Sequence, residues 1–300
     1  MVWDCLIVGG GPAGLSAALV LGRCRRRALV CDTGRPRNRS SGGLHGFLTR
    51  DGLVPIELLA IARRQLAPYD TVELRPMEVI DARRRGADAG FTATLADGTS
   101  VDCRTMLLTT GVVDELPDVP GLAPLYGKSV FHCPYCDGWE MRDQPLAVYG
   151  RGEKGLRLAL KLTLWSDDLV LCTDGAPPLS RAERKRLAAH AIAVRQEPIA
   201  RLESRRGRLE RIVFKAGEPL ERRGLFFNTG QRQHSDLARK LGCRMTRLNS
   251  VRTDKRECTN IPGLYAAGDA SRDVQLAIVA AAEGAKAAFA INEALLDEEL

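Results

Sequence analysis

A pattern of strand, glycine-rich turn and helix that occurs twice constrains the fold more than any other feature of the sequence. The apolar segment 4–8 leads into the glycine-rich turn 9–14, and a helical pattern follows. The same order returns with the apolar segment 145–149, the turn 150–155 and a second helical pattern. Closely spaced glycines between a strand and a helix are typical of parallel βαβ units. The sequence therefore predicts an α/β fold with two doubly wound, three-layer Rossmann-like domains.

Both predicted units continue in the same way after the helix. A further strand leads to an acidic residue in each, Asp32 in the first unit and Asp174 in the second. Each unit then ends with an apolar strand and a small polar turn, at 106–111 and at 225–230. The shared order indicates two copies of one architecture.

The C-terminal part of the chain has no counterpart in the second unit. Residues 261–269 predict one more strand that ends in a Gly-Asp turn, and an Ala-rich helix is predicted over 274–296. We infer that these pieces return to the first unit. We therefore expect a discontinuous first domain over 1–115 and 248–300, with the second domain, 116–247, inserted into it.

The composition is that of an ordinary globular chain. The 300 residues are 45% hydrophobic and 27% charged, which argues against a disordered or collagen-like protein. No apolar run is long enough to span a bilayer and no basic leader precedes the first strand, so we expect a cytoplasmic protein without a membrane span. The net charge of +7 is not accompanied by a nucleic-acid-binding signature, so we expect no nucleic acid partner. A basic surface can steer an acidic protein toward the molecule.

The first glycine turn has the features of a dinucleotide site. Gly9 permits a tight turn, Gly11 lets the backbone approach a pyrophosphate, and Gly14 lets the helix pack closely on the strand. The helix N-terminus offers N–H groups and the positive end of its dipole to phosphates. Asp32 can accept hydrogen bonds from ribose hydroxyls, but the spacing alone does not distinguish FAD from NAD. We expect 34–52, rich in Gly, Ser and Arg, to be a surface loop over this site.

Cys133 and Cys136 are the one close pair among nine cysteines. A zinc site, two inert thiols and a redox-active dithiol are the competing interpretations. Structural zinc needs four ligands and the sequence offers no second Cys-x-x-Cys pair, so we expect no metal. Two intervening residues allow a small disulfide ring, which favours the dithiol. Asp137 is suited to exchange protons with the thiols, and His132 and His45 are further candidates for activating a thiol, with a surface or structural role as the alternative for each.

The motifs occur in an order that resembles the low-molecular-weight thioredoxin reductases and their relatives. That order is the turn 9–14, Asp32, the turn 109–111, the segment 133–137, the second glycine turn and the segment 266–270. The resemblance spans nearly the whole chain and implies an FAD-dependent disulfide oxidoreductase with FAD in the first domain. The cofactor-binding residues that it implies are Gly9, Gly11, Pro12, Ala13, Gly14, Asp32, Thr110, Gly111, Gly268, Asp269, Gln275, Leu276 and Ala277.

The resemblance also implies the catalytic roles. Cys136 faces the flavin and can form a charge-transfer thiolate, Cys133 attacks the disulfide of the partner, and Asp137 manages protons. Thioredoxin or another dithiol/disulfide protein is the implied partner. Such proteins are usually homodimers with the redox pair in the inserted domain, so we expect a homodimer.

The second glycine turn departs from the family pattern. Its candidate nucleotide residues are Gly150, Gly152, Gly155 and Asp174. NADPH-using relatives carry a basic run after the second strand, whereas an acid stands here, and it repels a 2′-phosphate. Asp174 can instead bind the ribose diol of NADH, or the turn holds no nucleotide. Charged neighbours, Glu153 among them, favour an empty turn. We therefore expect NADPH use to be unlikely and keep NADH as an alternative.

An empty second turn changes the source of the electrons. A reduced ferredoxin is one alternative donor, and an acidic ferredoxin suits a basic surface. A dithiol oxidase, which takes electrons from a dithiol to the flavin and on to oxygen, is another. A non-enzymatic alternative is an FAD-binding redox sensor whose dithiol does not turn over.

Overall fold

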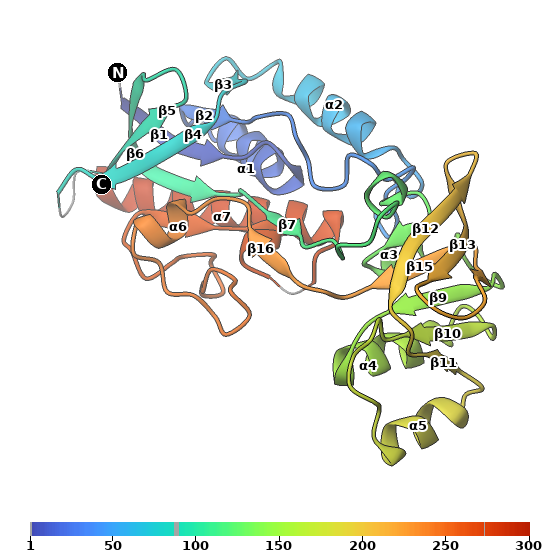
Figure 1. Ribbon diagram of the computed structural model, residues 1–300. Coiled ribbons are helices and arrows are strands. Elements are labelled where there is room, and N and C mark those ends of the chain that lie inside the picture. The colour runs from blue at the N-terminus through green and yellow to red at the C-terminus, as the bar shows by residue number, and fades with distance from the viewer. Residues whose placement is uncertain (1, 87–89, 273) are drawn as a thin grey trace. The chain divides into compact units, whose positions relative to one another are not determined.

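The computed structural model of the protein describes residues 2–86, 90–272 and 274–300 (Figure 1). The chain divides into two compact units. The first unit comprises Met1–Arg39, Gly46–Val113 and Arg232–Leu300, and the second comprises Ser40–His45 and Asp114–Gln231.

These limits differ from the expected ones at three places, the first being the start of the inserted part at Asp114 instead of residue 116. The inserted domain was expected to end at residue 247, but the contacts return the chain to the first unit at Arg232. Helix α6 (Leu237–Lys240) explains the earlier return, because Leu237 and Leu241 are buried in the core of the first unit. Nothing in the sequence pattern suggested that Ser40–His45 groups with the second unit.

The first unit is built on a seven-stranded sheet. Its strand order is β3-β2-β1-β6-β5-β4, and β17 pairs with β6. The strands are β1 (Val2–Val8), β2 (Ala28–Cys31), β3 (Val72–Arg75), β4 (Val79–Arg84), β5 (Phe91–Leu95), β6 (Ser100–Leu108) and β17 (Leu264–Ala266). Strands β1, β2, β3, β6 and β17 pair in parallel, whereas β4 and β5 pair antiparallel. All of β2 and the end of β1 are buried, as their apolar runs predict.

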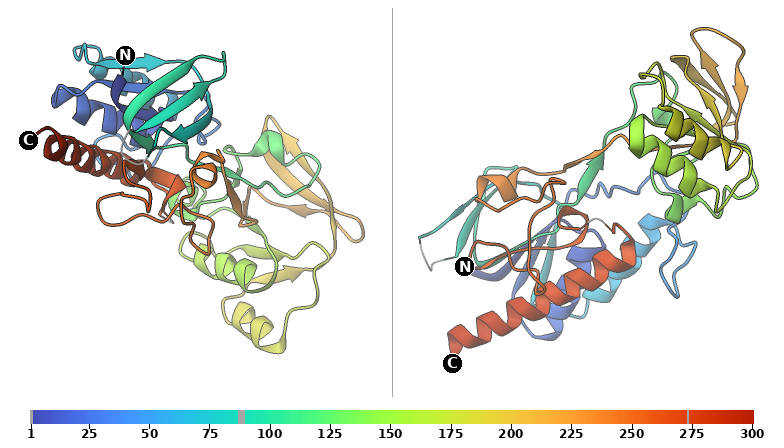
Figure 2. Two further views of the ribbon diagram at one scale, coloured as in Figure 1. Left: turned by 90° about the vertical axis from the view of Figure 1, so that its left-hand side faces the viewer. Right: turned by 90° about the horizontal axis from the view of Figure 1, so that it is seen from below.

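Helices cover this sheet. They include α1 (Pro12–Arg23), α2 (Pro55–Leu66) and α7 (Ala277–Glu299), with a short 3-10 turn η2 (Gly268–Ala270) before α7. Figure 2 shows α7 as the long helix that ends at the C-terminus. Helices α1 and α7 cross closely at Gly284. A Cβ added to this glycine would lie only 1.9 Å from the carbonyl oxygen of Ala13. The chain between β2 and α2 forms no helix or strand, as expected for a loop.

The second unit has a five-stranded parallel sheet in the order β11-β10-β9-β15-β8. These strands are β8 (Val130–Phe131), β9 (Leu146–Tyr149), β10 (Leu169–Cys172), β11 (Ala193–Arg195) and β15 (Gly224–Phe227). Its helical segments are η1 (Ala123–Leu125), α3 (Pro134–Asp137), α4 (Gly152–Leu162) and α5 (Arg181–Ala188). A separate antiparallel sheet holds β12 (Ile199–Arg205), β13 (Arg208–Phe214) and β14 (Leu220–Glu221).

Besides the crossings at both ends of Ser40–His45, the chain passes between the units along two paired strands, β7 (Val112–Asp114) and β16 (Gln231–Gln233). The predicted fold class is confirmed, because in each unit a parallel strand of the main sheet enters a helix through a glycine turn, and the second unit lies within the first in sequence. Within the described ranges, no helix combines the length and hydropathy that crossing a membrane requires.

Candidate active site

The first glycine turn is as tight as its sequence predicts. Gly9 has φ +109°, and a Cβ there would lie 2.4 Å from the carbonyl oxygen of Thr109. A Cβ on Gly14 would lie 1.9 Å from the carbonyl oxygen of Gly9. Both positions therefore exclude any side chain, which brings the start of α1 directly against the strand ends.

The N-terminus of α1 is open to an anion. Gly11 is the N-cap residue and provides no side-chain cap, and Pro12 occupies the first turn. No acidic residue lies in that turn. A Cβ built on Gly11 meets no protein atom within 4 Å. The helix thus presents N–H groups and its positive dipole end where a phosphate has room to approach.

Asp32 follows β2 and lies over the turn. A Cβ on Gly10 would lie 2.7 Å from its Cγ atom. The guanidinium of Arg63 on α2 donates to the Asp32 carboxylate at 2.8 Å. Sequence reasoning missed Arg63, because an arginine on an amphipathic helix has no motif to mark it. One carboxylate oxygen pairs with Arg63, and the acid keeps acceptor capacity for a ribose hydroxyl.

The turn after β6 contacts the same glycines. The Thr109 hydroxyl lies 3.0 Å from the carbonyl oxygen of Val8 and 2.8 Å from that of Gly9, and it donates to these acceptors. Thr110 is half-buried, and Gly111 has φ +68° with no atom within 4 Å of an added Cβ. The first unit therefore brings these predicted residues beside the glycine turn and leaves space at Gly111.

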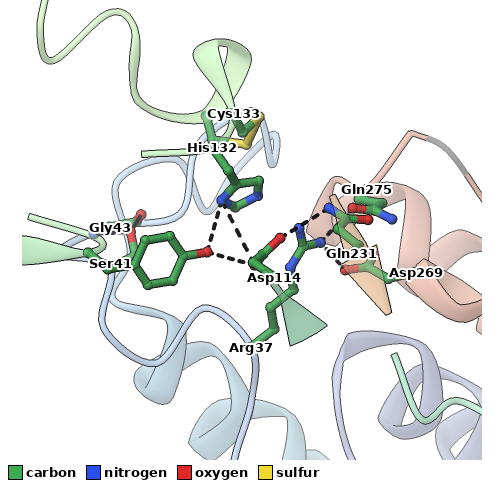
Figure 3. Close-up of a disulfide and its surroundings, with 11 residues drawn as sticks. Arg37, Ser41, Gly43, Asp114, His132, Cys133, Gln231, Asp269 and Gln275 are labelled. Atoms are coloured by element: carbon green, nitrogen blue, oxygen red, sulfur yellow. Dashed lines mark hydrogen bonds and ion pairs between the residues drawn. A yellow bond between two sulfur atoms is a disulfide. The ribbon is translucent and has the colours of Figure 1, made fainter. Parts of the chain in front are cut away.

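Residues after β17 complete this group. Gly268 has φ +74°, and its added Cβ would lie 3.1 Å from the Cβ of Ala13 in α1. Arg37, from the loop after β2, donates to Asp269 at 2.8 Å and to the Gln275 side chain at 2.7 Å (Figure 3). Leu276 is the N-cap of α7 and Ala277 is its first residue. Arg37 links two residues of the predicted site, and apart from its position in an arginine-rich loop no sequence signal marks it.

A buried ion network lies behind the Gly268 turn. Glu283 on α7 accepts from the backbone N–H of Gly268 at 2.9 Å and pairs with the Arg272 guanidinium at 2.8 Å. Arg272 also pairs with Glu257, which is fully buried and accepts from Lys286 at 2.6 Å. Burial raises the pKa of the Glu283 carboxyl, and Arg272 opposes that rise. Two carboxylates and two cations thus fix the turn that carries Asp269.

These groups fit a dinucleotide. A capless helix N-terminus with free space suits a diphosphate, Asp32 suits a ribose diol, and the Gly268–Asp269 turn presents backbone and carboxylate groups beside α1. The residues that the resemblance assigned to FAD in the first unit therefore include groups of the chemistry that FAD requires.

The second unit carries the cysteine pair. Cys133 and Cys136 form a disulfide with a Cα–Cα distance of 5.3 Å. Cys133 is the N-cap of the short helix α3, Pro134 starts the helix, and Cys136 lies within it. Both cysteines are half-buried. Pro134 is favoured at the first helical position, so the sequence itself starts the turn that brings the two sulfur atoms together.

Asp137 is the acid next to this disulfide. The pKa of its carboxyl is raised to about 7, mainly by burial and also by the charge of Glu140, while His45 opposes the rise. His45 lies 3.5 Å from Glu140. A carboxyl that titrates near neutral pH can both donate and accept a proton under ordinary conditions.

His132 precedes the disulfide and belongs to a hydrogen-bonded group. The Tyr126 hydroxyl donates to Asp114 at 2.6 Å and lies 2.9 Å from Nδ1 of His132 (Figure 3). Gln231 donates to the other Asp114 oxygen at 3.1 Å. The Asp114 side chain is 4% exposed. This group links the strands between the units to the residue before Cys133, and the sequence pointed only to His132.

The second glycine turn keeps the backbone form of the first. A Cβ on Gly150 would lie 2.5 Å from the Cα of Gly155, so strand and helix approach closely here too. Arg151 occupies the N-cap position, Glu153 lies in the first turn, and Gly152 has φ +52°. The fold of a nucleotide turn is present, but charged side chains stand at its helix N-terminus.

Asp174 is engaged by protein groups. Its carboxylate accepts from the Tyr149 hydroxyl at 2.9 Å, from Arg151 at 3.0 Å and from the backbone N–H of Ile199 at 2.8 Å. Burial and Asp174 raise the pKa of Tyr149 to about 12. A ribose diol would have to replace some of these donors. In the chain apart from 1, 87–89 and 273, no cluster of His, Cys, Asp or Glu suits a metal ion.

Comparison with known proteins places the chain in a family. Residues 3–284 match the family described as Pyridine nucleotide-disulphide oxidoreductase. A "Probable thioredoxin reductase" of Arthroderma benhamiae is 29% identical over 301 residues, which covers 90% of this chain and 74% of that protein. The crystal structure of HlmI has a TM-score of 0.94 and 37% identity, covering 99% of this chain and 94% of that one.

The crystal structure of the "Putative Thioredoxin Reductase TrxB" from Bacillus anthracis has a TM-score of 0.94 and 35% identity, and it covers 99% of this chain and 100% of that one. The likeness therefore extends over both units and includes the segment that holds the Cys133–Cys136 disulfide. The chain belongs to the pyridine nucleotide-disulphide oxidoreductase family and is a thioredoxin reductase-like flavin oxidoreductase, a family that implies FAD.

Proposed function

We propose that the protein transfers electron pairs between FAD and a protein disulfide, with thioredoxin or a similar protein as the partner, through Cys133 and Cys136. The observation that carries this proposal is the disulfide at the start of α3 beside an acid whose pKa is raised to about 7. A dithiol with its own proton carrier is what repeated thiol–disulfide exchange needs.

The exchange with the partner proceeds in two balanced steps. The Cys133 thiolate attacks one sulfur of the partner's disulfide, which forms a mixed disulfide and releases a partner thiolate. The Cys136 thiolate then attacks Cys133, which closes the Cys133–Cys136 disulfide and releases the second partner thiolate. The pair of electrons passes to the partner, whose two thiolates take up two protons.

Asp137 is the group that moves protons in this scheme. Its carboxyl is half-buried, and its pKa of about 7 lets it hold or release a proton near neutral pH. Cys136 precedes Asp137 in α3, so the acid is placed to serve the thiol that is regenerated in each cycle.

FAD would be held by the first unit. The N-terminus of α1 at Gly11 and Pro12 would bind the diphosphate of FAD, and Asp32 would bind a ribose. Asp269 and Gln275 would bind the part of FAD that lies on the other side of the diphosphate. When bound, FAD would serve as the redox group that accepts an electron pair from the dithiol or donates one to the disulfide. Residues Leu276 and Ala277 at the start of α7 would lie near the ring.

We propose further that NADPH is not the source of electrons. The support is Asp174, an acid that opposes a 2′-phosphate and that already accepts from three protein donors. NADH, a reduced ferredoxin and a dithiol substrate are the remaining sources. In the dithiol case the two exchange steps run in reverse, and oxygen takes the electrons.

The test is anaerobic bleaching of the flavin by NADPH, NADH, reduced ferredoxin and a dithiol in parallel. We expect bleaching by at least one of the last three and slow or no bleaching by NADPH. Rapid bleaching at micromolar NADPH would contradict the donor proposal. A protein that takes up no FAD, or a Cys133→Ser variant with normal turnover of a protein disulfide, would contradict the function itself. A single stoichiometric reduction without turnover would indicate a redox sensor.

A further inference from the structure

Arginines make up half of the residues that line a hollow on the second unit. Its volume is about 380 Å³, and its walls come from the segment after α3 and from the hairpin β12–β13. The lining residues are Glu140, Met141, Gln144, Arg205, Arg206, Arg208, Leu209 and Arg223. Met141 and Leu209 are buried, whereas the four arginines are exposed. The hollow thus has an apolar floor and a cationic rim.

Three of these arginines lie at the tip of the β12–β13 hairpin, where their mutual repulsion destabilises the hairpin. Arg205 and Arg208 face each other across the two strands, and like charges in that arrangement repel. The turn residue Arg206 has φ +53° and precedes Gly207 at φ +74°. Tight hairpin turns of this kind favour Asn or Asp at the first position, because their short polar side chains can hydrogen-bond locally and offset the strain of a Cβ atom at positive φ. Hairpin formation alone therefore does not explain why three arginines lie at this tip.

The rim arginines differ from the other arginines of the same hairpin. Arg201 and Arg211 both pair with Glu203. At the rim, Arg205 reaches a carboxylate only at 3.8 Å, from Glu210. Arg206, Arg208 and Arg223 have no ion-pair partner among residues 2–86, 90–272 and 274–300. Positive charge is thus paired along the strands, whereas four arginines and the single carboxylate of Glu140 line the hollow and leave it with a net positive charge.

The chemistry of the hollow favours a protein over a small anion. A site for a small anion is built from buried, preorganised polar groups. The side-chain atoms that are buried without a partner belong to Thr71, Arg85, Thr173, Arg222 and Gln233 in the described part of the chain, and none of these residues lines the hollow. Exposed arginines over an apolar floor are typical of a rim that meets another protein.

The hollow lies close in the chain to the redox disulfide. Glu140 and Met141 line it and follow Asp137 by a few residues. Glu140 also influences the carboxyl of Asp137, so its charge lies within electrostatic range of the dithiol segment. A protein that contacts this rim is thereby held against the unit that carries Cys133.

We propose that the arginine rim formed by Arg205, Arg206, Arg208 and Arg223 docks an acidic face of the thioredoxin-type protein whose disulfide reacts with Cys133. This proposal rests on the proposed function and adds the partner's charge and its docking surface. Opposite charges at such a rim raise the rate of encounter and lose their effect as salt screens them.

The experiment measures thiol–disulfide exchange without any pyridine nucleotide. FAD-loaded protein is reduced anaerobically with stoichiometric dithionite and mixed in a stopped-flow instrument with an acidic thioredoxin in its disulfide form. Flavin reoxidation is followed at low and at high salt. The double variant Arg206→Glu/Arg208→Glu should slow this reaction roughly tenfold or more at low salt, with a smaller difference at high salt. The same variant should react with dithiodipyridine, a small neutral disulfide, at the wild-type rate.

The control changes the same charge elsewhere on the second unit. Arg157 and Arg181 are exposed, neither lines the hollow, and neither has an ion-pair partner within the ranges that the structure covers. The variant Arg157→Glu/Arg181→Glu should react with the thioredoxin within about twofold of wild type. Equal slowing in both double variants, or none in the rim variant, would overturn the proposal. A wild type that reacts with dithiodipyridine alone would also overturn it and leave the dithiol chemistry standing. Failure with both disulfides would refute the proposed function.

Discussion

The two glycine turns share one backbone design and differ in what surrounds them. At the first turn, Gly11 leaves the N-terminus of α1 without a cap, an acid or any neighbouring atom within 4 Å of an added Cβ. At the second, Arg151 stands at the N-cap of α4 and reaches across to Asp174. The first turn thus has room for a diphosphate, whereas charged side chains surround the second.

The difference teaches that a glycine pattern specifies strand–helix packing before it specifies a ligand. Gly14 and Gly155 each bring a helix within contact of a strand end, and both positions exclude a Cβ. Binding depends on a separate set of residues, those at the helix N-terminus and at the end of the second strand. In the second unit we propose that the chemistry is carried by the disulfide and Asp137.

The sharpest test of the comparison places asparagine at matched positions of the two turns. In Gly11→Asn the new side chain can cap α1, so the apoprotein should keep its stability while FAD affinity falls about 100-fold, because the amide fills the space of the diphosphate. Gly152→Asn should bind FAD like wild type, since Asn tolerates its positive φ. Titration of apoprotein with FAD, followed by flavin fluorescence, measures both. Equal losses would break the comparison.

The next effect concerns the second unit alone. Asp137→Asn should slow reoxidation of the reduced enzyme by a disulfide about 100-fold, because the proton carrier is lost. The wild-type rate should change with pH around the carboxyl pKa of about 7, and the variant should lose that inflection. Stopped-flow measurements from pH 5 to 9 give the profile. An unchanged inflection in the variant would assign it to another group.

The same carboxyl links stability to pH. Its folded-state pKa is raised from 3.8 to about 7, so the stability that its protonated form contributes is fully present below pH 3.8 and is lost as pH rises through 7. Asp137→Asn should remove this loss. The variant should therefore gain in Tm relative to wild type between pH 5 and pH 8, and a constant difference would show that the carboxyl is not buried as described.

A smaller effect is expected from the network behind the first turn. Glu283→Gln keeps an acceptor for the Gly268 N–H but removes the charge that holds Arg272. FAD should dissociate roughly tenfold faster, because the turn that carries Asp269 is less firmly held. Glu293→Gln, on the same helix and without an ion pair in the described part of the chain, is the control. Loss of flavin fluorescence quenching over time reports the rate.

The smallest effect concerns the second turn. Asp174→Ala should leave the Tyr149 hydroxyl and the Ile199 N–H without their acceptor and lower the free energy of unfolding by ~1–3 kcal/mol. FAD content and the rate of disulfide exchange should stay at wild-type values. Thermal unfolding and flavin absorbance check both. A change in the response to NADH in this variant, with stability unaffected, would show that Asp174 serves a nucleotide.

The parts of the fold that depend on local pattern followed from the sequence. Strands 28–31 and 169–172 have the predicted bounds, because short apolar runs between turn signals form buried parallel strands. The helix at Gly11 starts where its proline directs. The redox pair was also recognisable, since its two cysteines are close in the chain and form the expected disulfide.

The parts that depend on distant contacts did not follow. Arg37, Arg63 and Glu283 contact residues of the predicted cofactor site from a loop and two helices, and no local signal marks a side chain whose partner lies far along the chain. The contacts return the chain to the first unit before residue 247, the limit expected from the sequence, for the same reason. Residues after Arg232 join the first unit through the burial of α6, and a short helix of ordinary composition does not reveal which core it enters.

The hexapeptide Ser40–His45 has a practical consequence for dissecting the molecule. It belongs to the second unit although it lies in a loop of the first, and a Cβ on Gly127 would lie 2.8 Å from the carbonyl oxygen of Ser40. The polypeptide therefore crosses from one unit to the other at four places. A recombinant fragment limited to 114–231 would lack this strip and expose the backbone it covers. A fragment of the second unit that is meant to fold by itself would therefore need residues 40–45 attached to it through a linker.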